Sequence, residues 1–285
     1  MREDFERVHM KKKYRTEVWS RWLVGGCLLA LGGCATPAQQ FTLRAAQDGL
    51  LREEFMGRGF RHVVFSKVSQ LDNSHALHLY LDGDGTPWAG PGQIAQDPSA
   101  RHALILDLMK QDPASAVLLG RPCYYLTSPD PACAPPLWTT ARYSEAVVAS
   151  LAVVANQIIA RHPLAAITLI GYSGGGVLAA LLAPRLARVT GVFTVAANLD
   201  TAAWTTHHHY SPLSGSLNPA EQAPLPSTIR QLHLYGALDR NVSQALTARF
   251  FAQQPAAQTR VLPDFDHRCC WAAQWPVLLA RFATK

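Results

Sequence analysis

The sequence predicts an α/β domain: a doubly wound, mostly parallel sheet flanked by helices. Strand-like apolar runs alternate with helical patterns along most of the chain, and such alternation indicates a parallel sheet with helical crossovers. Several strand candidates, such as the run Ala-Ile-Thr-Leu-Ile at 166–170, are apolar almost throughout, which suits a sheet covered on both faces. Of the 285 residues, 48% are hydrophobic and 16% charged, which permits a sizeable core and excludes a disordered chain.

The individual elements follow from hydrophobic periodicity. Strands are predicted at 62–66, 77–81, 116–119, 167–171, 191–196, 231–235 and 259–262. Helices are predicted at 99–111, 144–161, 174–188, 243–253 and 272–282. Residues 198–227, rich in Pro, Ser, His and Thr, indicate an excursion over one end of the sheet. Because no internal repeat or interdomain linker is visible, residues 59–285 are expected to form one domain.

The N-terminus has the layout of a secretory signal. A basic stretch at 10–15 precedes a short apolar run, 22–33, that ends in small residues and is too short for an ordinary membrane-spanning helix. Its end, Leu31-Gly32-Gly33-Cys34, resembles the lipobox of bacterial lipoproteins. This resemblance implies a signal peptide at 1–33, lipidation of Cys34, a linker and N-terminal segment at 34–58, and anchoring in the bacterial cell envelope, on the periplasmic side of the outer membrane. An ordinary cleaved signal is the alternative, and Met10 is an alternative start.

Charge gives little support for an anionic partner. The chain carries a net charge of +6, but residues 1–33 hold seven basic and four acidic residues. The remainder has 19 basic and 16 acidic residues, a net charge of +3, with no Lys/Arg run interleaved with aromatics. Nucleic-acid binding is therefore not expected. We expect a monomer whose contact with the membrane is a lipid anchor.

Four cysteines remain after the signal and Cys34: Cys123, Cys133, Cys269 and Cys270. An exported protein meets an oxidising compartment, so disulfides are favoured. A local bridge between Cys123 and Cys133 would close a Pro-rich loop, but it would leave two adjacent cysteines, so cross-pairing stays open. Neither pair has the spacing of a zinc knuckle.

The stretch Gly171-Tyr-Ser173-Gly-Gly175 follows an apolar strand and leads directly into an Ala/Leu-rich helix. A serine at a sharp strand-to-helix turn needs neighbours without side chains, and the helix start directs N–H groups at the site. A glycine-rich turn that only allows close packing is the alternative. From about residue 60 onward the chain resembles the α/β-hydrolase family, which implies that Ser173 is the nucleophile of a serine hydrolase.

The family order of nucleophile, acid and base continues downstream. Asp239, in Gly236-Ala-Leu-Asp239, resembles the family's acid loop, and His267 follows the last predicted strand, where the resemblance implies the base. Asp200 is the competing acid, because it also follows a strand. His233 lies inside a strand and is expected to be structural. Contiguous histidines at 207–209 cannot all face one ion, so no metal or other cofactor is expected.

The oxyanion hole requires two backbone donors. Gly174 is predicted to supply one, and the loop Asp82-Gly83-Asp84-Gly85 the other, through the N–H of Asp84 or, second, of Gly83. Asp82-Gly83 stands where the family often has His-Gly. The carboxylates of Asp82 and Asp84 either organise this loop or favour a substrate with a cationic part. The loop lacks the later ligands of a calcium site.

Together these residues predict a serine hydrolase that cleaves a carboxylic ester, a small molecule or a lipid, through an acyl-enzyme at Ser173. A peptidase or thioesterase using the same three residues is an alternative. A catalytically silent, envelope-binding lipoprotein is another. The fold cannot choose between substrates.

Overall fold

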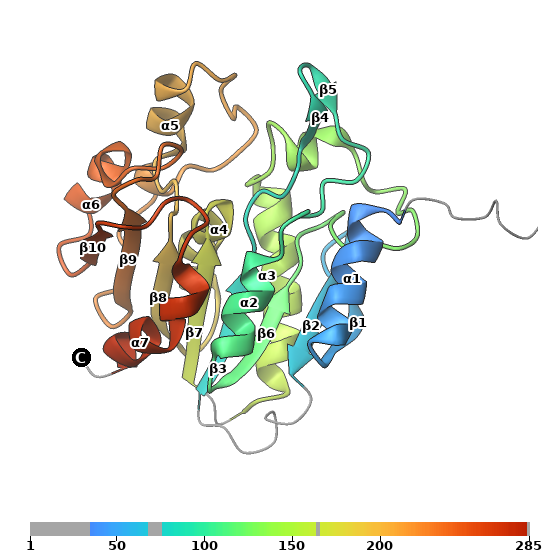
Figure 1. The fold of residues 1–285 in the computed structure, drawn as a ribbon, viewed down its shortest axis with the longest axis horizontal. Coiled ribbons are helices and arrows are strands. Elements are labelled where there is room, and N and C mark those ends of the chain that lie inside the picture. Colours follow the sequence, from blue (N-terminus) through green and yellow to red (C-terminus); the bar gives the residue numbers. More distant parts are fainter. Residues whose placement is uncertain (1–34, 68–75, 164–165, 284–285) are drawn as a thin grey trace, which may run out of the picture. The chain divides into compact units, whose positions relative to one another are not determined.

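A mixed sheet of eight strands forms the centre of the described chain, in the order β1-β2-β6-β3-β7-β8-β9-β10 (Figure 1). The computed structural model describes residues 35–67, 76–163 and 166–283, so the predicted signal peptide and Cys34 lie outside the described residues. The strands are β1 (Leu50–Met56), β2 (Arg61–Lys67), β3 (Ala76–Leu81), β6 (Ser115–Leu119), β7 (Ala166–Tyr172), β8 (Val189–Val195), β9 (Arg230–Gly236) and β10 (Gln258–Leu262).

Parallel pairing dominates this sheet. From β6 to β10 every neighbouring pair is parallel, whereas β1 pairs antiparallel with β2, and β2 antiparallel with β6. The predicted doubly wound, mostly parallel α/β sheet is therefore confirmed. Because the six parallel strands share one direction, their carboxyl ends lie at one edge, where ligand sites of such folds form.

Helices cover both faces of the sheet (Figure 1). The helices are α1 (Pro37–Gln47), α2 (Leu104–Gln111), α3 (Glu145–Ala160), α4 (Gly174–Leu182), α5 (Thr201–His207), α6 (Ala248–Ala252) and α7 (Trp271–Ala283). Successive strand residues point to opposite faces. Phe65 of β2 accordingly packs in the core under α1, α2 and α7, and its neighbour Val64 in the core under α3 and α4. No helix in the described part of the chain is long and apolar enough to cross a membrane.

Residues 35–58, within the predicted linker and N-terminal segment, contribute a helix and an edge strand. Thr36 begins α1 through a capping box with Gln39. Pro37 lies in the first turn, where a backbone N–H would have no acceptor within the helix, so the missing N–H of proline costs no hydrogen bond. Phe41 and Ala45 then bury one face of the helix. The sequence did not predict β1, because an edge strand needs to be apolar on one face only and this one contains polar residues instead of an apolar run.

Other boundaries also differ from the prediction. The helix predicted at 99–111 begins only at Leu104, because Ser99 bonds the N–H of Tyr125 through its hydroxyl and stays in the preceding loop. The excursion at 198–227 contains α5, which Asp200 caps. A small hairpin, β4 (Trp88–Gly90) and β5 (Gln93–Ile94), projects at the same end of the molecule (Figure 1).

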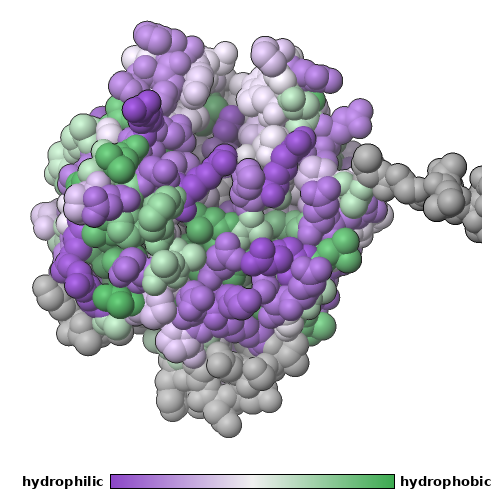
Figure 2. Space-filling view, viewed as in Figure 1, coloured by the Kyte–Doolittle hydropathy of each residue, from purple (hydrophilic) through white to green (hydrophobic). Residues whose placement is uncertain are grey.

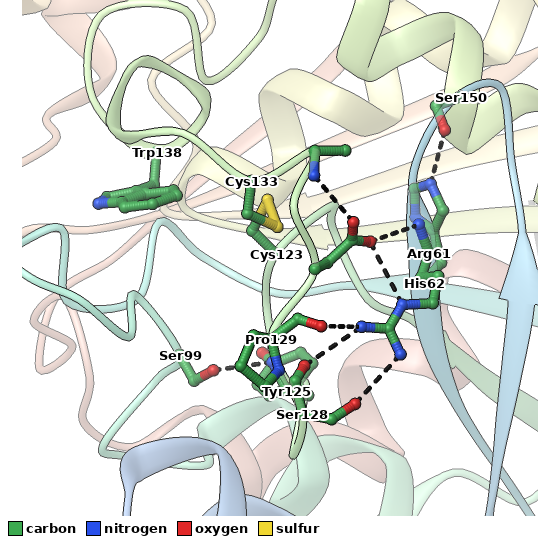
Figure 3. Close-up of a disulfide and its surroundings, with 12 residues drawn as sticks. Arg61, His62, Ser99, Cys123, Tyr125, Ser128, Pro129, Cys133, Trp138 and Ser150 are labelled. Atoms are coloured by element: carbon green, nitrogen blue, oxygen red, sulfur yellow. Dashed lines mark hydrogen bonds and ion pairs between the residues drawn. A yellow bond between two sulfur atoms is a disulfide. The ribbon is translucent and has the colours of Figure 1, made fainter.

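The structure joins Cys123 to Cys133 by a disulfide with Cα atoms 5.6 Å apart (Figure 3). Cys269 is joined to its neighbour Cys270. The local pairing is thus the one found among the alternatives that the sequence leaves open. Beside the first bridge, Arg61 binds the segment between its cysteines through Asp130 and the carbonyl of Pro129 (Figure 3).

Candidate active site

Four predicted site residues lie at the carboxyl edge of the sheet. Ser173 directly follows β7, Asp84 follows β3, Asp239 follows β9 and His267 follows β10. Their strands are widely separated in sequence but run parallel in one sheet, so their carboxyl ends converge. The topology therefore brings together residues that the sequence places up to 183 positions apart.

Ser173 occupies a strained turn between β7 and α4. Its φ of 51° lies in the left-handed region, which residues with a side chain rarely adopt. The flanking glycines make this turn possible: a Cβ on Gly171 would lie 2.5 Å from the carbonyl carbon of Gly175, and a Cβ on Gly175 would lie 2.5 Å from that of Leu81. The backbone N–H of Ser173 donates to Val195, which fixes the turn to the neighbouring strand.

A continuous hydrogen-bonded chain runs from the serine through the histidine to the aspartate. Nε2 of His267 lies 3.1 Å from Oγ of Ser173, and Nδ1 of His267 lies 2.8 Å from Oδ2 of Asp239. The Asp239 side chain is fully buried, whereas the histidine side chain is 21% exposed. A buried carboxylate on Nδ1 holds the imidazole in the tautomer whose Nε2 can accept a proton from the serine hydroxyl.

Asn241 was missed by the sequence reasoning, yet it contacts both members of this pair. The other oxygen of Asp239, Oδ1, accepts the backbone N–H groups of Asn241 (2.8 Å) and Val242 (2.9 Å). The Asn241 side-chain amide lies 3.3 Å from Nε2 of His267. Its position two residues after an aspartate in a turn was the available signal, because Asp side chains often bond the backbone two residues on.

Asp200, the competing candidate for the catalytic acid, has a structural role. Its Oδ1 accepts the backbone N–H of Ala203 and the side-chain amide of Asn218, so this carboxylate caps α5 and fixes the excursion. His233 is buried in β9 against the hydroxyl of Thr194, and burial lowers the pKa of its imidazole to about 3. Within the described residues, no group of three or more His, Cys, Asp or Glu side chains is placed to hold a metal ion.

The predicted oxyanion donors differ in their availability. The N–H of Gly83, the second choice, donates to the Asp82 carboxylate at 2.7 Å and is therefore occupied. The N–H of Asp84 makes no hydrogen bond to any residue that the structure describes. The N–H of Gly174 lies in the first turn of α4, where no intrahelical acceptor exists. Of the three predicted donors, Asp84 and Gly174 are thus the two whose N–H groups are not taken up by another described residue.

Both carboxylates of the loop are bound by the protein. Burial alone would raise the pKa of Asp84, but the charges of Arg142 and Arg121 outweigh it and lower that pKa to about 2. Burial raises the pKa of Asp82 to about 6, although Tyr125 donates a hydrogen bond to its carboxylate at 2.6 Å. Of the two alternatives for these side chains, the geometry favours the organisation of the loop over attraction of a cationic substrate.

A cleft of about 1120 Å³ opens above the serine. The excursion carrying α5 forms one wall and the loop carrying β4 forms the other, and Figure 2 shows the hollow between these two projections. Its apolar lining combines aliphatic side chains with five aromatic ones: Phe41, Trp88, Tyr172, Trp204 and Tyr210. Many polar side chains share this lining, among them Arg142, Asn241 and His267, and a concave site that combines apolar walls with polar groups is typical of small-molecule binding.

Comparisons with known proteins agree on the fold. The esterase Pf2001 of Pyrococcus furiosus matches with a TM-score of 0.54 at 12% identity, over 83% of this chain and 93% of that one. XC6422 of Xanthomonas campestris, described as an α/β serine hydrolase without a lid, matches with a TM-score of 0.51 at 12% identity, over 81% and 94%. EstE5 soaked with p-nitrophenyl butyrate gives 0.52 at 13% identity, over 93% and 95%. This chain therefore has the α/β-hydrolase fold. No family model and no curated protein sequence matches it.

Proposed function

We propose that this protein is a serine hydrolase that cleaves a carboxylic ester through an acyl-enzyme at Ser173. The observation that carries the proposal is the hydrogen-bonded chain from Ser173 through His267 to the buried Asp239, at a strained turn that faces a cleft. The solved structures of the same fold include esterases, which makes an ester the first substrate to test. No cofactor is needed for this chemistry.

The reaction follows from the positions of the groups. His267 takes the proton of the Ser173 hydroxyl as Oγ attacks the ester carbonyl, and Asp239 stabilises the imidazolium that forms. The N–H groups of Gly174 and Asp84 donate to the oxyanion, each contributing about 3 kcal/mol to the reduction of the barrier. The imidazolium then protonates the leaving alcohol. Water, activated by the same imidazole, releases the acid from Ser173.

Two other functions use the same scaffold. A peptidase or thioesterase would differ only in the leaving group, and the cleft is large enough for either. A silent envelope-binding protein would keep the fold without turnover. The strained serine counts against the silent form, because a backbone conformation of this kind costs about 1–3 kcal/mol and a binding scaffold has no use for it.

Hydrolysis of p-nitrophenyl esters of graded acyl length, compared with a matched thioester and peptide anilide, tests the proposal. We expect turnover of at least one ester by the wild type and its loss in Ser173→Ala, with unchanged thermal unfolding. Equal rates for the two proteins would contradict it. Faster cleavage of the thioester or the anilide would replace the ester as the proposed substrate class, while Ser173 would remain the proposed nucleophile.

We further propose that the enzyme is a monomer, lipidated at Cys34 and held in the bacterial cell envelope on the periplasmic side of the outer membrane. The lipobox-like sequence Leu31-Gly32-Gly33-Cys34 supports this location. Metabolic incorporation of an alkyne-tagged fatty acid into the wild type, and its loss in Cys34→Ala, is the expected result. Equal labelling of the two would contradict the anchor.

A further inference from the structure

A buried ionic cluster lies directly behind the proposed oxyanion hole. Its members are the Asp84 carboxylate, the guanidinium groups of Arg121 and Arg142, and the Tyr143 hydroxyl. Arg121 Nη1 lies 2.8 Å from Oδ1 of Asp84, and Arg142 Nη1 lies 2.8 Å from Oδ2. The Tyr143 hydroxyl lies 2.7 Å and 2.8 Å from the two oxygens. Both arginine side chains are buried, with 3% and 9% exposed.

The carboxylate of this cluster occupies the space where a side chain at position 174 would begin. A Cβ built on Gly174 would overlap Oδ1 of Asp84 and would lie 2.5 Å from the Tyr143 hydroxyl oxygen. Gly174 and Asp84 are the two residues whose N–H groups are proposed to hold the oxyanion. The cluster therefore packs against one donor and contains the side chain of the other.

The same segment that supplies Arg121 also fixes the backbone of the oxyanion loop. Arg121 donates to the carbonyl of Asp82 at 3.1 Å, and Tyr124 donates to the carbonyl of Asp84 at 2.9 Å. Tyr125 donates to the Asp82 carboxylate, which in turn accepts the Gly83 N–H. These bonds restrain the Asp84 N–H, since its peptide lies between two peptides whose carbonyls, those of Asp82 and Asp84, accept from side-chain donors.

An ionised carboxylate beside an oxyanion hole would repel the charge that develops in the transition state. Two guanidinium groups face the Asp84 carboxylate, and Arg121 also lies near the Asp82 carboxylate, so their charges offset this repulsion. The cluster is largely buried, where charges are poorly screened. A gain in stability does not account for such a cluster, because a buried ion pair seldom stabilises a protein more than apolar side chains of the same volume would. Its place behind the two donors points to a role in the reaction.

We propose that Arg121 and Arg142 are positioning residues of the oxyanion hole, which hold the Asp84 carboxylate against Gly174 and neutralise its charge. This inference rests on the proposed hydrolase function. Arg142 also lines the cleft, but neither arginine is required to touch the substrate for this role. Both act through Asp84, on the direction of two backbone N–H groups and on the electrostatic potential at the oxyanion.

Steady-state hydrolysis of p-nitrophenyl acetate by Arg142→Gln, Arg142→Lys and Tyr143→Phe tests the proposal, at a temperature where circular dichroism shows each variant folded. Removal of the charge in Arg142→Gln should lower kcat by at least about 30-fold, approaching the 10²- to 10³-fold loss known for a removed oxyanion donor, with KM changed less than about threefold. Arg142→Lys should recover most of the loss, because it restores the charge. Tyr143→Phe, which retains every charge, should lower kcat by about 3- to 10-fold, less than a full donor would.

Arg61→Gln is the matched control, because Arg61 also binds an aspartate, Asp130, but belongs to none of the proposed machinery. Its kcat should stay within about twofold of the wild type, because Arg61 is not among the residues that line the cleft. Wild-type kcat in both Arg142→Gln and Tyr143→Phe, or a change confined to KM, overturns the inference while leaving the hydrolase proposal intact. If Arg142→Gln does not fold, the Tyr143→Phe result decides alone. A wild type that cleaves no ester overturns both.

Discussion

Gly174→Ala adds one methyl group to the most crowded point of the candidate site. The new Cβ would lie 2.5 Å from the Tyr143 hydroxyl oxygen and would overlap the Asp84 carboxylate. Neither neighbour can withdraw easily, since Arg121 and Arg142 hold the carboxylate from both sides. Overpacking of a buried site costs about 1–3 kcal/mol. Alanine in place of glycine in a helix returns up to about 1 kcal/mol.

The net result should be a loss of about 1–2 kcal/mol in the free energy of unfolding. Activity should fall further than stability. The methyl group displaces either the N–H of residue 174 or the loop that carries the Asp84 N–H, and loss of one oxyanion donor lowers kcat by about 10²- to 10³-fold. Urea unfolding followed by circular dichroism measures the first quantity, and hydrolysis of p-nitrophenyl acetate the second.

Gly90→Ala is the matched control in the same chain. Its Cβ would meet only a side-chain oxygen of Gln93, at 3.8 Å, which is ordinary van der Waals contact. We expect its stability to change by less than about 0.5 kcal/mol and its kcat to stay within about twofold. A Gly174→Ala variant that matched Gly90→Ala in both measurements would refute the packing argument and the assignment of this donor.

Three further predictions concern the acid, a disulfide and a buried histidine. Asp239→Asn should lower kcat by about 10³- to 10⁴-fold with little change in fold, because the His267 imidazole is no longer held in the tautomer that has a proton on Nδ1. A loss below tenfold in ester hydrolysis would contradict the assignment. Replacing Cys123 and Cys133 by serine opens a loop with a sequence separation of 10 and should lower the free energy of unfolding by about 3 kcal/mol, measured in urea; an unchanged midpoint would count against the bridge. Burial lowers the pKa of His62 from 6.5 to about 4, so between these values only the unfolded state takes up its proton, and stability falls on acidification by about 1.4 kcal/mol per pH unit from this group. Asp82, with its pKa raised from 3.8 to about 6, opposes this trend between those two values, since its folded form binds the proton more tightly. His62→Gln should remove the His62 contribution from the slope measured between pH 6.5 and 4, and an unchanged slope would refute it.

The buried strands of the sheet and the position of the strained serine were predictable because local physics determines them. Buried parallel strands such as β7 must be apolar on both faces, so their sequence is distinctive. The turn at Ser173 requires glycine at 171 and 175, where any Cβ would collide with backbone atoms. Asp239 and His267 could be placed after strands by the same reasoning, and parallel strands then bring their carboxyl ends to one edge.

Elements with weaker local signals were missed. The strand β1 lies at the sheet edge, where Glu53 is partly exposed and Glu54 exposed, so it lacks an apolar run. The helix α5 is capped by Asp200, which the sequence offered only as the competing catalytic acid because it follows a strand. In both cases contacts with residues distant in sequence determine the structure. A local sequence pattern carries no information about those contacts.

The ionic cluster behind the oxyanion loop could not be predicted from any local pattern. Arg121 and Arg142 lie 37 and 58 positions from Asp84, and neither belongs to a recognisable motif in its own segment. The one signal was Gly174, because a Cβ there would meet the Asp84 carboxylate and the Tyr143 hydroxyl. Position 174 has to be glycine in this structure, because no side chain fits there beside the Asp84 carboxylate.

The central claim is that Ser173 is a reactive nucleophile activated by His267. Incubation of the intact protein with a fluorophosphonate, followed by peptide mass spectrometry, measures this reactivity whichever ester the enzyme prefers. We predict one stoichiometric adduct on Ser173 in the wild type and its loss in His267→Ala. A wild type that stays unlabelled, or an adduct that forms equally fast without the imidazole, would contradict the account.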